Sequence, residues 1–142
     1  MIKNFAGDRL YKQICDRLND AYHKIHTTNN LIDGEFCRSA ENKLKFITKR
    51  KHAKLLSSAT SALMVALLSW QMRGKKVACV NYSYVASANQ AALLNDVELF
   101  DIDHKGLIKI DQKFNHDLVI PVSLYGNTID YDNLQVSAHT KV

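Results

Sequence analysis

The loop Ser57–Ser61, with the sequence SSATS, holds the residues whose types and spacing point most directly to chemistry. It leads without a break into the apolar stretch 62–68, which predicts a helix that is buried on every side. The first turn of a helix leaves backbone N–H groups unpaired and carries a partial positive charge. Small hydroxyl residues there either cap the helix or hold an anion such as a phosphate, and a cap is the more common role. The residues of this loop alone leave both roles open.

Histidine and cysteine give no second candidate site. His23 and His26 are three apart on a predicted helix, but no third ligand is placed beside them, so a solvated pair is favoured and no metal site is predicted. Cys15, Cys37 and Cys79 are far apart and odd in number. This pattern favours three free thiols in a reducing, cytoplasmic setting.

A basic run, Lys49–His52, is the main feature that would suit a nucleic acid. Residues 1–54 carry twelve Lys and Arg against six Asp and Glu, whereas residues 55–142 carry seven against eight. Clustered cations supply sequence-independent phosphate contacts, yet no aromatic stacking motif, zinc spacing or helix-turn-helix pattern accompanies Lys49–Lys51. A solvated helix end is the favoured interpretation, and nucleic acid is not an expected partner.

The amino-acid composition is that of an ordinary globular chain. It has 142 residues, of which 46% are hydrophobic and 23% charged, enough for one domain with a core. The N-terminus has no apolar core of the signal-peptide type, and the run Leu55–Trp70 is too short to span a bilayer. We expect neither secretion nor membrane insertion.

Two helices and a short strand are predicted before the SSATS loop. After Asp8, apolar residues recur at intervals of three and four up to Ile25, and turn residues 27–30 end that helix. A second helix is predicted from Glu35 to about Thr48. Its expected buried side consists of Phe36, Ala40, Leu44 and Ile47. Residues 53–56 are predicted to form a short strand that feeds the loop.

From residue 73 onward strands alternate with helices. Strands are predicted at 77–80, 97–101 and 118–122, with a further short one possible at 107–110, and a small-residue helix is predicted at 85–94. The acidic stretch 130–132 could start another helix. This alternation predicts a parallel α/β sheet, in which the loops 57–61 and 81–84 lie at the carboxyl ends of the strands, where ligands gather.

Several motifs together resemble a known family. The segments LLSSATSALMVALL, VNYSYVASANQAALLNDVELFDID and LVIPVSLYGNTIDYDNL are similar to successive N-terminal motifs of the DegT-like sugar aminotransferases, and LIDGEFCRSAENKLKFIT resembles their entry helix. The resemblance covers about residues 9–136. It implies the N-terminal part of the large domain of the aspartate-aminotransferase fold, a mostly parallel sheet with flanking helices, truncated here. Residues 1–34 would be an entry helix and linker, and residues 35–142 a partial cofactor-binding domain.

The same resemblance implies pyridoxal 5'-phosphate as cofactor and assigns three residues to it. Ala59 and Thr60 would hold the phosphate through backbone N–H groups and the Thr60 hydroxyl, as suits a helix N-terminus. Tyr84 would place its ring against the pyridine ring; without the family, a core or interface tyrosine would be favoured. Val80, Asn81 and Ser83 depart from the family's usual proline, serine and threonine, which bears on loop geometry more than on chemistry.

The family implies a reaction whose central groups are not matched in this sequence. Its Schiff-base lysine and its carboxylate on the pyridine nitrogen lie beyond the Tyr-Gly segment, so no catalytic residue is nominated here. A full-length relative would move an amino group from an amino-acid donor to a nucleotide-linked keto sugar, as a homodimer, while this chain alone is expected to be inactive. Sugar dehydration with the same cofactor is not separated from transamination. The alternatives are a non-catalytic, cofactor-binding or regulatory relic, and a basic nucleic-acid-binding protein.

Overall fold

The computed structural model describes residues 7–109 and 113–142. By their contacts they form two compact units, Met1–Leu55 and Leu56–Val142, each of which is described by itself. The sequence-based division after residue 34 stays a prediction.

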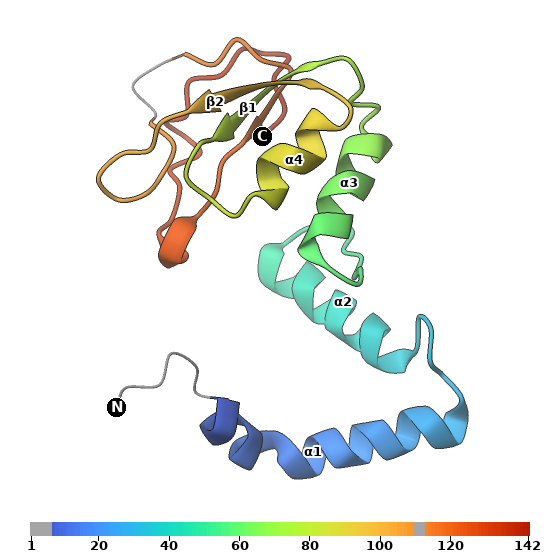
Figure 1. Cartoon of the computed structure of the whole chain (residues 1–142). Coiled ribbons are helices and arrows are strands. Elements are labelled where there is room, and N and C mark those ends of the chain that lie inside the picture. Colours follow the sequence, from blue (N-terminus) through green and yellow to red (C-terminus); the bar gives the residue numbers. More distant parts are fainter. Residues whose placement is uncertain (1–6, 110–112) are drawn as a thin grey trace. The chain divides into compact units, whose positions relative to one another are not determined.

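The first unit contains two helices, α1 (Gly7–Thr28) and α2 (Glu35–Thr48), as the apolar periodicity predicts (Figure 1). The basic run begins where α2 ends: Lys49 is the C-cap, in a left-handed conformation with φ 52°. The predicted buried side of α2 is wrong for most of its residues. Phe36, Leu44 and Ile47 are 40%, 39% and 73% exposed, respectively, and only Ala40 is partly buried.

A charged residue, Glu41, is instead the buried residue of α2. Its carboxylate Oε1 accepts a hydrogen bond from the backbone N–H of Leu55 at 3.1 Å and lies 3.1 Å from Lys54 Nζ. The same Nζ lies 2.8 Å from Asp33 Oδ1. Lys54 and Leu55 are therefore attached to α2 by polar contacts, and residues 53–56 form no strand, so the strand predicted there is wrong. A segment becomes a strand only when a neighbouring strand accepts its backbone hydrogen bonds.

This polar attachment predicts a pH window for the first unit. The N–H of Leu55 and the Lys54 ammonium lower the pKa of Glu41 below its ordinary 4.5, and Lys54 lowers that of Asp33 below 3.8. Hydrogen bonds to Asp33 and then Glu41 raise the pKa of Lys54 above 10.5. A carboxyl group whose pKa is lower in the folded state stabilises that state above the pKa that it has when unfolded, and this stabilisation is lost as the pH falls through its folded-state pKa. An ammonium group whose pKa is raised in the folded state stabilises it at lower pH, and this stabilisation is lost as the pH rises through its folded-state pKa.

We therefore expect residues 53–55 to stay attached to α2 between about pH 5 and pH 10 and to detach outside that window. Amide hydrogen exchange of Leu55 followed against pH measures this. Lys54→Met should lower the Leu55 protection at neutral pH and flatten its acid limb, while Lys51→Met, an exposed neighbour, should leave both unchanged. A Leu55 amide that exchanges equally fast in the parent and in Lys54→Met would contradict the attachment.

The second unit is a small α/β unit. Its elements in chain order are α3 (Ala59–Ser69), β1 (Lys76–Val80), α4 (Ala86–Ala92), β2 (Asp96–Phe100), β3 (Leu118–Ile120) and the 3-10 turn η1 (Leu124–Gly126). The sheet has the order β2-β1-β3 with both pairs parallel, so the prediction of a parallel α/β sheet is confirmed. α4 packs on α3 and on β1 and β2 (Figure 1).

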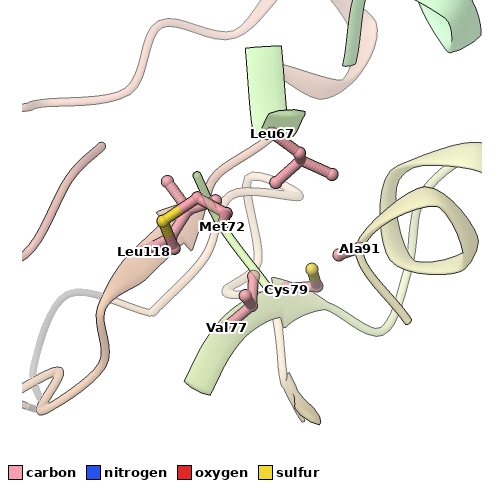
Figure 2. Close-up of a cluster of buried hydrophobic side chains, with 6 residues drawn as sticks. All are labelled: Leu67, Met72, Val77, Cys79, Ala91 and Leu118. Carbon is pink, nitrogen blue, oxygen red and sulfur yellow. The ribbon is translucent and has the colours of Figure 1, made fainter. Parts of the chain in front are cut away.

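β1 is the central strand and separates two apolar clusters, because its side chains alternate between the faces of the sheet. On the face where Val77 and Cys79 point, the first cluster includes residues of α3, α4 and β3; Figure 2 shows Leu67, Met72, Val77, Cys79, Ala91 and Leu118 converging there. On the opposite face, Ala78 and Val80 join a second cluster. Its other buried members are Ile108, Phe114, Val119 and Leu134. That cluster is covered by loop segments rather than by a helix.

Four local predictions need correction in this unit. The helix predicted to be buried all round is α3, where Leu67 is buried but Val65 and Leu68 are 48% and 51% exposed, because only one side of it faces α4 and the first cluster. β3 ends at Ile120 rather than 122, since Pro121 has no N–H to donate. The possible strand at 107–110 is reduced to one antiparallel bridge between Ile108 and Ile102, and residue 110 lies outside the described residues.

The fourth correction concerns the acidic stretch after residue 129, which starts a turn and not a helix. Asp130 Oδ2 accepts a hydrogen bond from Asn133 Nδ2 at 2.7 Å. The following residues run beside β3: the N–H of Val119 donates to the carbonyl of Lys141 at 2.8 Å, and the N–H of Lys141 to that of Asp117 at 3.0 Å. The backbone of Lys141 is thus bonded at the edge of the sheet and not within a helix. No helix in the described parts of the chain is long and apolar enough to cross a membrane.

Candidate functional site

The N-terminus of α3 is the first part of the candidate site. Ser58 is the N-cap, and its Oγ accepts a hydrogen bond from the N–H of Ser61 at 3.1 Å. The N–H of Ala62 donates to the carbonyl of Ser58 at 3.0 Å. The cap thus engages Ser61, whereas the N–H groups of Ala59 and Thr60 come too early in the helix to have an intrahelical acceptor.

Charge at this helix start suits an anion. The first turn of α3 contains no acidic residue, so nothing there neutralises the positive end of the helix. Ala59 is exposed and Thr60 half-buried, which leaves their backbone within reach of a ligand. Ser58 therefore supplies the cap. The phosphate role of Ala59 and Thr60 stays a prediction, which their place at the helix start suits.

Tyr84 lies in the loop between β1 and α4 and is 77% exposed. No ring contact or hydrogen bond described for the chain joins its side chain to Thr60. Its exposure argues against a core tyrosine in this chain. The cofactor roles of Ala59, Thr60 and Tyr84 stay predictions.

Loops at the carboxyl edge of the sheet are fastened to one another by residues that the sequence analysis did not single out for this. Asn81, directly after β1, donates from Nδ2 to Asp101 Oδ1, directly after β2, at 2.5 Å. Asp103 Oδ1 accepts the N–H groups of Lys105 at 2.8 Å and Leu107 at 3.0 Å, and the Leu107 bond is the main cause that lowers the pKa of Asp103 below 3.8. Asp101 and Asp103 therefore hold these loops in place. The departure at Asn81 has a structural use, because its amide can pair with a carboxylate.

A pocket of about 350 Å³ lies at the same edge. It is lined by residues that follow β1, β2 and β3, including Tyr82, His104, Lys105, Leu124, Tyr125 and Asn127. The Tyr82 hydroxyl beside that of Tyr125 raises the pKa of Tyr125 above its ordinary 10.0. This pocket could have been predicted from the rule that loops at the carboxyl ends of neighbouring parallel strands lie close together.

The lysines next to β1 lie at the opposite end of that strand. Lys75 and Lys76 lie at the amino end of β1, where Asp117 accepts the N–H of Lys76 at 2.9 Å. Among the described residues no cluster of three or more His, Cys, Asp or Glu could hold a metal ion. The His26 ring lies 4.3 Å from that of Tyr22, and His116 Nε2 lies 3.0 Å from Glu98 Oε2.

Comparisons with known proteins agree on one family. The model of the DegT/DnrJ/EryC1/StrS aminotransferase family matches residues 12–141. A structure of a DegT DnrJ EryC1 StrS aminotransferase from Brucella abortus aligns with a TM-score of 0.84 and 21% identity over 94% of this chain and 40% of that one. DesV from S. venezuelae, in complex with a ketimine intermediate, aligns with a TM-score of 0.79 and 18% identity over 89% of this chain and 36% of that one.

A third structure, the putative sugar aminotransferase Spr1654 from Streptococcus pneumoniae in its PMP-form, aligns with a TM-score of 0.62 and 25% identity over 69% of this chain and 27% of that one. The first two likenesses bear on the fold alone. The chain thus spans two-fifths or less of the length of these structures.

Proposed function

Because the chain belongs to the DegT/DnrJ/EryC1/StrS aminotransferase family, we propose that it forms the phosphate-holding part of a pyridoxal-phosphate-dependent sugar aminotransferase. The observation that carries the proposal is the start of α3, where the N–H groups of Ala59 and Thr60 precede any intrahelical acceptor and no acidic residue stands in the first turn. Thr60 adds a hydroxyl donor, and Tyr84 offers an exposed aromatic ring for the flat face of the cofactor.

The chemistry of transamination is the cofactor's, which when bound supplies an electron sink. The chain's own part is to bind the phosphate, to orient the ring and to hold both at the carboxyl edge of the sheet. We propose as substrates an amino-acid donor and a nucleotide-linked keto sugar, and as assembly a homodimer. The free thiols of Cys15, Cys37 and Cys79 support a cytoplasmic location, since disulfides are typical of oxidising compartments.

We further propose that the 142-residue chain alone binds the cofactor without catalysing transamination. A general base and Schiff-base partner must reach the cofactor, and Lys75 and Lys76 lie at the opposite, amino end of β1. No lysine of the chain matches the family's motif. A non-catalytic cofactor binder is thus the expected behaviour of the isolated chain.

The test uses pyridoxamine phosphate, which has no aldehyde and cannot react with surface lysines. We expect saturable binding of this probe in isothermal titration calorimetry, competition by inorganic phosphate, and at least tenfold weaker binding of pyridoxamine, which lacks the phosphate. Tyr84→Leu should weaken the probe severalfold and leave competition by phosphate unchanged, because it removes the ring contact only. Tyr131→Leu, another exposed tyrosine, is the matched control.

Equal affinities for pyridoxamine and for pyridoxamine phosphate would contradict the proposed phosphate site. Turnover of an amino donor and a keto sugar by the purified chain alone would overturn the proposal that it is inactive, while leaving the cofactor site in place.

A further inference from the structure

Residues 134–141, here called the strap, run along the outer edge of β3. The sheet order β2-β1-β3 leaves β3 with a neighbouring strand on one side only. On the other side, the N–H of Val119 donates to the carbonyl of Lys141 at 2.8 Å, and the N–H of Lys141 donates to the carbonyl of Asp117 at 3.0 Å. The strap thus takes the place of a fourth strand at this edge and satisfies backbone groups that a parallel neighbour would satisfy.

Few contacts hold the strap to the rest of the second unit. Of the strap residues, all of which the structure describes, only Leu134 is buried. Thr140 Oγ1 donates to the carbonyl of His116 at 2.6 Å. Lys141 Nζ lies 3.4 Å from the carbonyl oxygen of Trp70 and 5.6 Å from the centre of its ring. Because segments with few buried apolar contacts open locally at a low cost in free energy, the end of the strap should detach from β3 far more easily than the sheet unfolds.

The edge beneath the strap is well suited to pairing with another strand. β3 (Leu118–Ile120) contains only aliphatic residues, and no charge interrupts it. When the strap is detached, the N–H of Val119 loses its acceptor, the carbonyl of Lys141. An uncovered edge strand with high β propensity and no charge is a template for pairing with another chain.

The opposite edge of the sheet is protected in a different way. Among the described residues β2 has no strand on its outer side, and its exposed residues include Asp96 and Glu98. Two copies of a chain related by a two-fold axis pair identical edges antiparallel. At β2 such pairing would bring the carboxylates of the two copies close together, which is unfavourable. At β3 no charge opposes it, so this edge is the one that suits a second copy.

We propose that the strap is a displaceable cover, and that the edge of β3, once uncovered, pairs antiparallel with the same edge of a second copy of this chain. The inference goes beyond the proposed function because it concerns the sheet edge and needs neither cofactor nor substrate. The homodimer proposed above would be present in the parent protein, so the edge is tested by association in addition to the parent's own state.

The experiment uses the full chain with Lys141→Pro, which removes the N–H that donates to Asp117. In dilute solution we expect the Val119 amide to exchange its hydrogen at least about tenfold faster than in the parent. Sedimentation velocity should show larger species than in the parent, in a share that rises with protein concentration, and the Val119 amide should regain protection as they form. Val142→Pro makes the same change at the next residue, whose N–H has no hydrogen-bond partner among the described residues, and should behave as the parent does.

Circular dichroism shows whether each variant keeps its fold. If Lys141→Pro unfolds, Thr140→Val decides, because it removes only the hydroxyl bond to His116 and should make the Val119 amide exchange about threefold faster, with association in proportion. Exchange and sedimentation equal to the parent's in the folded variants overturn the proposal. So does association in which the Val119 amide stays unprotected, since another surface would then join the copies.

Discussion

Thr60→Glu should abolish binding of pyridoxamine phosphate, with a loss of at least about a hundredfold, while the helix that carries it stays folded. A carboxylate in the first turn would lie where the phosphate is expected and repel it. The same carboxylate interacts favourably with the positive end of α3 and should add about 0.3–1 kcal/mol to stability. Opposite effects on binding and on stability separate this result from simple unfolding.

The control for this prediction is Thr60→Ala, which removes only the hydroxyl. Since the backbone N–H groups of residues 59 and 60 remain, we expect a loss of only about three- to tenfold in affinity. Calorimetry measures both affinities, and thermal unfolding measures both stabilities. If Thr60→Glu binds the probe as well as the parent does, the phosphate does not lie at the start of α3.

The sequence predicts local elements well where one periodic pattern decides them. The apolar repeat after Asp8 and the run from Glu35 both became helices with nearly the predicted bounds, and the apolar run at 77–80 became the central strand. The parallel pairing of β1 and β2 agrees with the helix α4 between them, whereas no helix is described between β2 and β3. These are properties of residues close together in the chain.

Burial was harder to predict, because it depends on which segments meet. Glu41 does not belong to the side of α2 that was predicted to be buried, yet it is buried, with the N–H of Leu55 and the ammonium of Lys54 beside its carboxylate. Ile47 looked like a core residue and is 73% exposed. The same limit applies to the site: Ala59 and Thr60 are neighbours in sequence and could be nominated together, whereas Tyr82 and Tyr125 are brought together only by the order of the strands.

Phe114→Ala should remove most of the stability of the second unit. The ring is fully buried in the second cluster, 5.1 Å between centroids from Phe100 in an edge-to-face arrangement. Its backbone also joins the C-terminal segment, since its N–H donates to the carbonyl of Gln135 at 2.8 Å. Truncating a buried phenylalanine typically costs about 3–5 kcal/mol.

That cost is large because single domains are stable by only about 5–15 kcal/mol and because loops, not a helix, cover this face of the sheet. We expect urea unfolding, followed by far-ultraviolet circular dichroism, to show a much lower midpoint or a unit already unfolded in water. Phe46→Ala, at a position that is 85% exposed in the first unit, should change stability by less than about 0.5 kcal/mol. A loss below about 1 kcal/mol for Phe114→Ala would mean that the loop-covered cluster adds little, and that the first cluster alone holds the sheet.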